Sequence, residues 1–136
     1  MMGTTYKIFM LLASANTRYK HANVVQMSPQ EYLHLALPFG WLGGPKLDQK
    51  KVDMLTKSKT AWPNPMLSIK ENSNGELQVG PHDDDHRAMA SKARGDKLID
   101  VDIVRGRKFA RENPSVSDED MAKRVANENV LPENNS

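Results

Sequence analysis

Residues 80–88 read Gly80-Pro81-His82-Asp83-Asp84-Asp85-His86-Arg87-Ala88. The residues just before them, 77–79, have the apolar pattern of a strand. Residues 85–94 have the pattern of a helix, which Gly95 ends because glycine readily adopts the left-handed conformation of a helix C-terminus. The segment therefore lies where a strand passes into a helix, and the rest of the prediction is built outward from it.

A hairpin precedes this segment. Residues 66–69 predict its first strand, the Asn-Ser-Asn-Gly sequence of residues 72–75 predicts its turn, and residues 77–79 are the returning strand. After the helix, residues 98–104 predict another strand, and the apolar residues 8–12 predict a buried first strand.

Helices are predicted from their caps. Ser28 as N-cap, Pro29 at the first helical position and Glu31 three residues after the serine form a capping box. The helix that they open ends before Pro38. Further helices are predicted over residues 47–59, over residues 107–113, and after the N-cap Ser117.

The composition is that of one small domain. The chain has 136 residues, close to the usual domain size of ~100–150, and a net charge of only +2. It has no cysteine, which excludes disulfides, thiolate metal sites and cysteine nucleophiles. No apolar run reaches the ~20 residues of a membrane helix.

Residues 8–12 are followed by Ala13-Ser14-Ala15, as in a signal peptide, but they are fewer than the ~7–15 apolar residues of a signal core. We therefore predict a cytoplasmic protein with no membrane partner.

The segment has the chemistry of a phosphate site. A helix N-terminus presents unpaired N–H groups and a partial positive charge. His86 and Arg87 add side-chain donors there, and a guanidinium can bind two phosphate oxygens at once. Asp83, Asp84 and Asp85 could hold Mg²⁺, which prefers oxygen ligands, or one of them could act as a general base.

Two other interpretations of the segment stay open. In the first, the aspartates only cap the helix, and His86 and Arg87 are solvated. In the second, His82 and His86 bind a transition metal, which requires both to lie on one face of a helix. Pro81 and the three aspartates favour a loop there instead.

Four stretches of the chain occur in the same order as the motifs of a known protein family. They are the helix start at residues 27–33, Pro65-Met66-Leu67 at the start of a strand, the motif at residues 82–88, and residues 99–103 after Gly95. In this order they resemble the ParB/sulfiredoxin-like superfamily, in the branch of small phage and bacterial ParB-like nuclease domains. The resemblance covers residues 24–105.

This resemblance implies an α+β fold with a small mixed sheet and flanking helices. The expected domain covers residues 1–113 and is followed by a C-terminal helix and mobile tail over residues 114–136. It implies a nucleotide, ATP or CTP, whose phosphates are held by His86 and Arg87, with Asp83 orienting a metal ion or water. The expected function is binding of nucleotide or nucleic-acid phosphate. A Mg²⁺-dependent phosphohydrolase or nuclease activity would use Asp83 and His86 as catalytic residues.

Asp84 and Asp85 depart from the motif, which has Gly and Arg at these positions. Extra carboxylates repel a polyphosphate unless a cation intervenes, so the site either needs Mg²⁺ or has lost its chemistry. In the latter case we expect a non-catalytic phage protein that regulates a host protein, with Phe39 and Trp41 in the partner surface. A third hypothesis is DNA binding through the basic residues Arg105, Arg107, Lys108 and Arg111.

Overall fold

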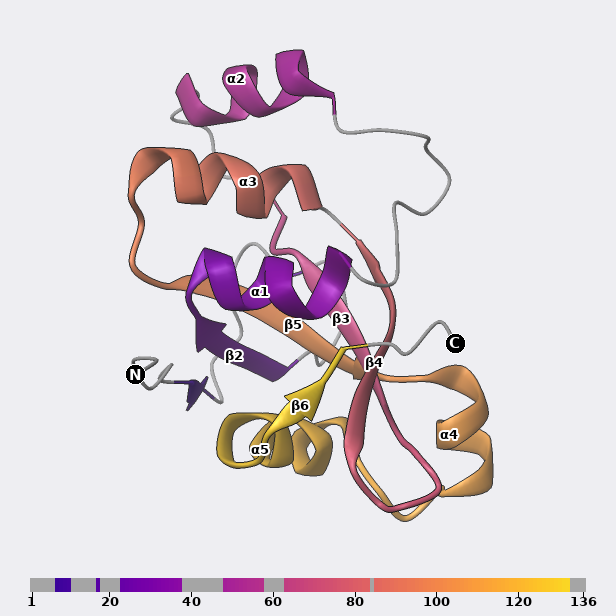
Figure 1. Cartoon of the computed structure of the whole chain (residues 1–136). Coiled ribbons are helices and arrows are strands. Elements are labelled where there is room, and N and C mark those ends of the chain that lie inside the picture. Colours follow the sequence, from indigo (N-terminus) through magenta and orange to yellow (C-terminus); the bar gives the residue numbers. More distant parts are fainter. Residues whose placement is uncertain are drawn as a thin grey trace.

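In the part of the chain that the structure describes, six strands form one curled mixed sheet (Figure 1). The computed structural model describes residues 7–10, 17, 23–37, 48–57, 63–83 and 85–132. For residues 83 and 85 it describes only the backbone. The strands are β1 (Ile8–Met10), β2 (Asn23–Met27), β3 (Met66–Glu71), β4 (Leu77–Asp83), β5 (Ile99–Arg105) and β6 (Val130–Leu131). Their order in the sheet is β1-β2-β5-β3-β4-β6. The β5–β3 and β4–β6 pairs are parallel and the other pairs antiparallel, which confirms the predicted mixed sheet.

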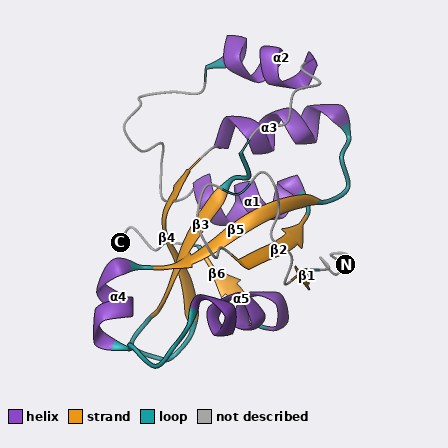
Figure 2. Cartoon of the chain, turned by 180° about the vertical axis from the view of Figure 1, so that it is seen from behind, coloured by secondary structure: helices purple, strands orange, loops and turns teal. Residues whose placement is uncertain are grey.

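Five helices accompany this sheet in the described part of the chain. They are α1 (Pro29–Ala36), α2 (Gln49–Lys57), α3 (Asp85–Arg94), α4 (Arg107–Glu112) and α5 (Asp118–Asn127). α3 contacts both α1 and α2, and the three lie one above another in Figure 1. Seen from behind in Figure 2, β5 passes in front of α1. α5 contacts β1, β2 and β5 at the other end of the sheet. The helices and mixed sheet together confirm the α+β class.

The hydrophobic core lies on one face of the central strands. Val101 and Ile103 of β5 are fully buried, and their register partners on this face include Val25 of β2 and Leu67 of β3. The same cluster takes in Tyr32, Leu33, Leu35 and Ala36 of α1 and Met121, Ala122 and Val125 of α5. Burial of one such large side chain contributes ~1.5–3 kcal/mol. Helix α5, which follows residue 113, therefore contributes side chains to the same core.

The start of α5 is fixed by a reciprocal capping box. The Ser117 hydroxyl accepts a hydrogen bond from the Asp120 N–H at 3.0 Å, and the Asp120 carboxylate accepts one from the Ser117 N–H at 3.4 Å. Both bonds satisfy N–H groups that the helix leaves without an internal partner. The N-cap predicted at Ser117 is confirmed, as is Ser28, whose hydroxyl accepts from the Glu31 N–H at 3.0 Å in α1.

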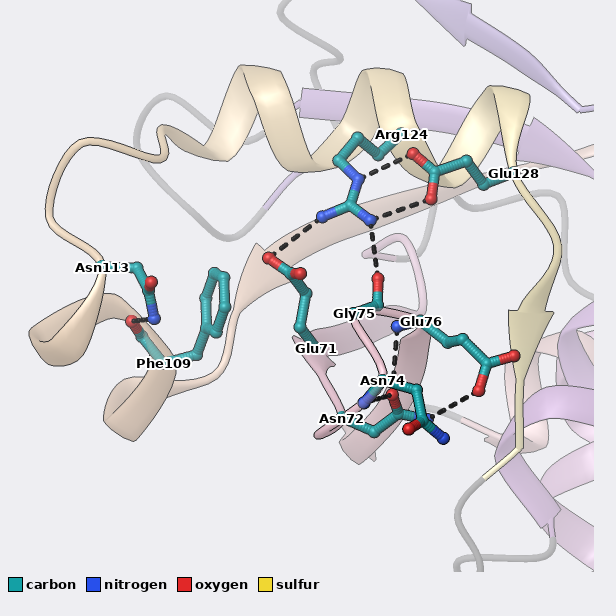
Figure 3. Close-up of polar contacts among 9 residues, drawn as sticks. All are labelled: Glu71, Asn72, Asn74, Gly75, Glu76, Phe109, Asn113, Arg124 and Glu128. Carbon is teal, nitrogen blue, oxygen red and sulfur yellow. Dashed lines mark hydrogen bonds and ion pairs between the residues drawn. The ribbon is translucent and has the colours of Figure 1, made fainter.

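The last turn of α5 is tied to the β3–β4 hairpin by Arg124 (Figure 3). Its guanidinium donates two hydrogen bonds to Glu128, at 2.7 and 2.9 Å, and one to the carbonyl of Gly75 at 3.1 Å. It also lies 3.1 Å from a carboxylate oxygen of Glu71. Gly75 has a φ of +78°, which suits the glycine that the hairpin turn requires. One side chain thus joins the C-terminal helix to a turn far away in the sequence.

Two strands were not predicted. β2 has polar residues at its first and fourth positions, Asn23 and Gln26, so it lacks strict alternation, and β6 is only two residues long. In α2, Val52 and Leu55 are buried, whereas Met54 is 54% exposed.

A strand at residues 8–10, the hairpin and the five predicted helices are confirmed within the described residues. The first strand is not buried as predicted, because Ile8 is 45% exposed and Phe9 and Met10 are only partly buried.

Candidate functional site

A β-bulge sets the direction of the chain before α3. Leu67 of β3 pairs with His82 of β4, while Ile69 pairs with Val79, so β4 has one residue more than β3 between the two pairs. The Ser68 hydroxyl donates to the carbonyl of Pro81 at 2.7 Å within this irregularity. A bulge changes which face later residues occupy, and His82 is consequently buried, only 5% exposed.

The bulge explains why Gly80 and Pro81 occur together. A Cβ atom on Gly80 would lie 3.0 Å from the Ser68 hydroxyl oxygen, which is tighter than ordinary contact. Proline has no N–H to give to a strand ladder, so a bulge is one of the few strand positions that accept it. Pro81 and the aspartates predicted a loop after Val79, but β4 continues to Asp83.

The three aspartates join β4 to α3. Asp83 is the last residue of β4 and Asp85 the first of α3. Asp84 and the side chains of its two neighbours lie outside the described part, so the Mg²⁺ site stays a prediction. The side chains that the structure does describe contain no group of three or more His, Cys, Asp or Glu that could hold a metal. His82 and His86 lie in a strand and a helix, so the two-histidine site on one helix face is not formed.

His86 joins α3 to α2. Its Nε2 accepts a hydrogen bond from the backbone N–H of Asp48 at 2.9 Å. Asp48 is the residue before α2, and its carboxylate accepts from the N–H groups of Lys50 and Lys51 at 3.0 and 3.3 Å. This nitrogen of His86 therefore serves as an acceptor that positions the start of α2. The expected phosphate-binding and catalytic roles of His86 stay predictions.

Arg87 lies in a pocket of about 190 Å³ between α3 and the start of β5. Ser91 and Arg94 line the same pocket, and residues four and three apart share one face of a helix. The remaining lining comes from the segment before β3 and from residues leading into β5, namely Asn64, Pro65, Asp96, Leu98, Ile99 and Asp100. Of the predicted site residues whose side chains the structure describes, Arg87 alone lines this pocket.

The α3 wall of the pocket is rich in hydrogen-bond donors. The Nη1 atom of Arg87 is buried, and Ser91 is fully buried. The guanidinium of Arg94 donates to the Asp96 carboxylate at 2.8 and 3.2 Å and to the Ser91 hydroxyl at 3.4 Å. Arg94 is thus fixed in place by an ion pair at the rim of the pocket.

The opposite wall is rich in acceptors and is held by a buried network. Asn64 is 4% exposed, and its side-chain N–H donates to Asp102, a fully buried carboxylate, at 3.1 Å. Asp102 also accepts from the hydroxyl of Thr17 at 2.7 Å. Asp100 accepts from the Gln26 amide at 2.9 Å. Hydrogen bonds of this kind compensate the cost of burying a charge and fix the lining side chains.

The basic cluster predicted for DNA is divided by the structure. Arg105 donates from Nε to Asp118 at 2.7 Å and also bonds the Val116 carbonyl, so it connects β5 to the start of α5. Arg107, Lys108 and Arg111 are exposed on α4. DNA binding by these three stays a prediction. Phe39 and Trp41, the predicted partner surface, lie outside the described residues.

Sequence reasoning missed most of this pocket. One signal could have found the α3 wall of the pocket. The bounds of α3 were predicted correctly, and the spacing of Arg87, Ser91 and Arg94 places these residues on one face of that helix. Asn64 and Asp100 had no such signal, because only the sheet pairing brings residues before β3 beside β5.

No known protein family, no curated protein and no solved structure matches this chain. The ParB/sulfiredoxin-like resemblance therefore stays a prediction. Among the described helices, none combines the length and the apolar character that crossing a membrane would require.

Proposed function

We propose that the pocket between α3 and β5 binds a phosphate group carried by a nucleotide or a nucleic acid. The observation that carries this proposal is the α3 wall, where Arg87, Ser91 and Arg94 line one pocket. Arg87 and Arg94 are seven residues apart, or about 10.5 Å along the helix axis. Their long side chains can reach the same ligand from both ends of the wall.

Arginine suits this role better than other cations. Its guanidinium is planar, keeps its charge at any working pH, and offers forked donors that match phosphate oxygens. The neighbouring Ser91 hydroxyl accepts from Arg94 and so helps to hold this guanidinium in the lining. A hydrogen bond to a charged group contributes ~1.5–3 kcal/mol, which is enough for one arginine to change affinity about tenfold or more.

Hydrolysis of the bound phosphate is a separate step of the proposal. Asp83 and His86, the predicted catalytic pair, lie at the end of β4 and in the first turn of α3, close in sequence to Arg87. An assay for nucleotide or nucleic-acid hydrolysis with and without Mg²⁺ tests this step independently of binding.

The binding test compares two α3 cations. Arg87→Ala removes a pocket arginine, whereas Lys92→Ala removes an exposed cation from the same helix outside the pocket lining. Calorimetric titration with inorganic phosphate, ATP and CTP should give an affinity about tenfold or more weaker for Arg87→Ala and nearly unchanged for Lys92→Ala. Circular dichroism checks that both variants are folded. Equal losses in the two variants, or no binding by the wild-type chain, would overturn the proposal.

A further inference from the structure

We infer that Asn74 is a site of spontaneous deamidation, and that the contact of Arg124 with the β3–β4 turn sets the rate of this reaction. The sequence supplies the reactive pair, because Asn74-Gly75 is the one Asn-Gly dipeptide in the chain. Glycine has no Cβ atom, so its backbone nitrogen is the least hindered that can follow an asparagine. The Asn74 side chain is exposed, so water and hydroxide can reach it.

The reaction needs only the chain and water. The Gly75 nitrogen attacks the Cγ carbon of Asn74, and the new N–Cγ bond closes a succinimide ring. The Cγ–Nδ2 bond breaks, and the amide group leaves as ammonia with the proton of the Gly75 N–H. Water then opens the ring at one of its C–N bonds or the other, which gives aspartate or isoaspartate.

The folded turn opposes this attack because it engages the attacking nitrogen. The Gly75 N–H donates to the Asn72 carbonyl at 2.9 Å, and the nitrogen must leave this bond to reach Cγ. The side-chain oxygen of Asn72 accepts from the N–H groups of Asn74 and Glu76 at 2.9 and 3.0 Å (Figure 3). Asn72 thus holds three successive N–H groups, and Asn74 reacts only when the turn opens.

Arg124 of α5 holds the turn closed from outside. Its guanidinium donates at 3.1 Å to the carbonyl of Gly75, the residue that supplies the attacking nitrogen. The guanidinium is itself fixed by Glu128 at the end of α5 and by Glu71 on β3. Opening the turn therefore requires breaking a charge-assisted hydrogen bond to α5. The docking of α5 and the protection of Asn74 are consequently coupled.

The products do not fit the turn. Isoaspartate adds one backbone carbon before Gly75, which displaces the N–H bonded to Asn72 and the carbonyl bonded to Arg124. Both products also add a carboxylate to a turn that already holds Glu71 and Glu76, and like charges repel. Deamidation therefore loosens the attachment of α5 to the hairpin.

The test follows the full chain in mildly alkaline buffer by mass spectrometry of its peptides, which distinguishes both products from asparagine. Asn74 should react faster than Asn72, whose side chain is held in the turn. Asn113 is the unreactive reference, because Pro114 has no N–H to lose. Unfolding in urea should accelerate the reaction at Asn74 about tenfold or more. No reaction at Asn74 in the folded chain, or equal rates with and without urea, would overturn the inference.

Arg124→Ala tests the role of α5, and Lys123→Ala is the matched control because it removes an exposed cation from the same helix. Arg124→Ala should accelerate deamidation of Asn74 about fivefold or more, while Lys123→Ala leaves the rate unchanged. Circular dichroism checks that both variants fold. If Arg124→Ala does not fold, Glu128→Gln weakens the hold on the guanidinium more gently and should raise the rate about twofold. Equal rates in a folded variant of this pair and in Lys123→Ala would contradict the role of Arg124.

Discussion

Arginine side chains have different surroundings at the two ends of the molecule in Figure 1. At the α5 end, Arg124 is bonded to Glu128 and Gly75 and paired with Glu71, so the guanidinium is used for contacts within the protein. At the α3 end, Arg87 and Arg94 line a pocket. An ion pair alone does not separate the two cases, because Arg94 is bonded to Asp96 much as Arg124 is bonded to Glu128. The difference is that Arg124 also bonds the Gly75 carbonyl of a distant hairpin, whereas Arg94 lines a pocket.

The electrostatics of the α5 end agree with a structural role. Hydrogen bonding to Glu128 is the main cause that raises the pKa of Arg124, with Glu71 adding to it and burial opposing it. The same hydrogen bond lowers the pKa of Glu128. Each group therefore favours the charged form of the other. Three variants test how far this end stabilises the fold without affecting the pocket.

The largest expected effect concerns the core beneath α5. Met121→Ala should lower the free energy of unfolding by about 2–5 kcal/mol, because Met121 is fully buried and its truncation leaves a cavity. Met54→Ala is the matched control, since Met54 is 54% exposed on α2 and its loss should change the free energy by less than about 0.5 kcal/mol. Urea denaturation measures both. Equal effects would contradict the assignment of α5 to the main core.

A smaller effect is expected for Arg124→Ala, at about 1–2 kcal/mol of unfolding free energy. Its ion pairs are partly exposed and each contributes ~0.2–1 kcal/mol, to which the bond to the Gly75 carbonyl adds. Lys123→Ala removes an exposed pair with Glu119 on the same helix and should cost no more than about 0.5 kcal/mol. Phosphate affinity should be unchanged in both variants. If Arg124→Ala weakened phosphate binding and Lys123→Ala did not, Arg124 could not be assigned a purely structural role.

The smallest effect is a dependence on pH. Because the pKa of Glu128 is lowered in the folded protein, its contribution is present above the ordinary glutamate pKa of ~4.3 and is lost as pH falls through the lower folded value. The stability advantage of the wild type over Glu128→Gln should therefore shrink from neutral to acid pH, by less than about 1 kcal/mol. Thermal unfolding as a function of pH measures it. In the Arg124→Ala background this advantage should be absent at every pH, and its persistence there would contradict the assigned cause.

Short sequence patterns predicted the helices and most of the strands, but they did not predict which of these elements lie side by side. Ser28 and Ser117 fixed the starts of α1 and α5, because capping bonds involve residues only three apart. The predicted bounds of the helix over residues 85–94 match α3, since Gly95, with a φ of +78°, marks its end.

The lining of the pocket and the partners of the basic residues depend on contacts between residues that are far apart in the sequence. Asn64 reaches the site only because β3 and β5 pair in parallel, a contact that no short pattern encodes. Arg105 looked like part of an exposed basic cluster, but Asp118 and the Val116 carbonyl engage it. The bulge at Gly80 and Pro81 likewise became visible only through its pairing with β3.

The most direct test of the phosphate site is an amide chemical-shift titration of the wild-type chain with inorganic phosphate. The account predicts saturable shifts at Arg87, Ser91 and Arg94 on α3 and at Asn64 and Asp100 across the pocket, with Arg124 and Glu128 unchanged. Shifts confined to the α5 end, or none at millimolar phosphate, would contradict it.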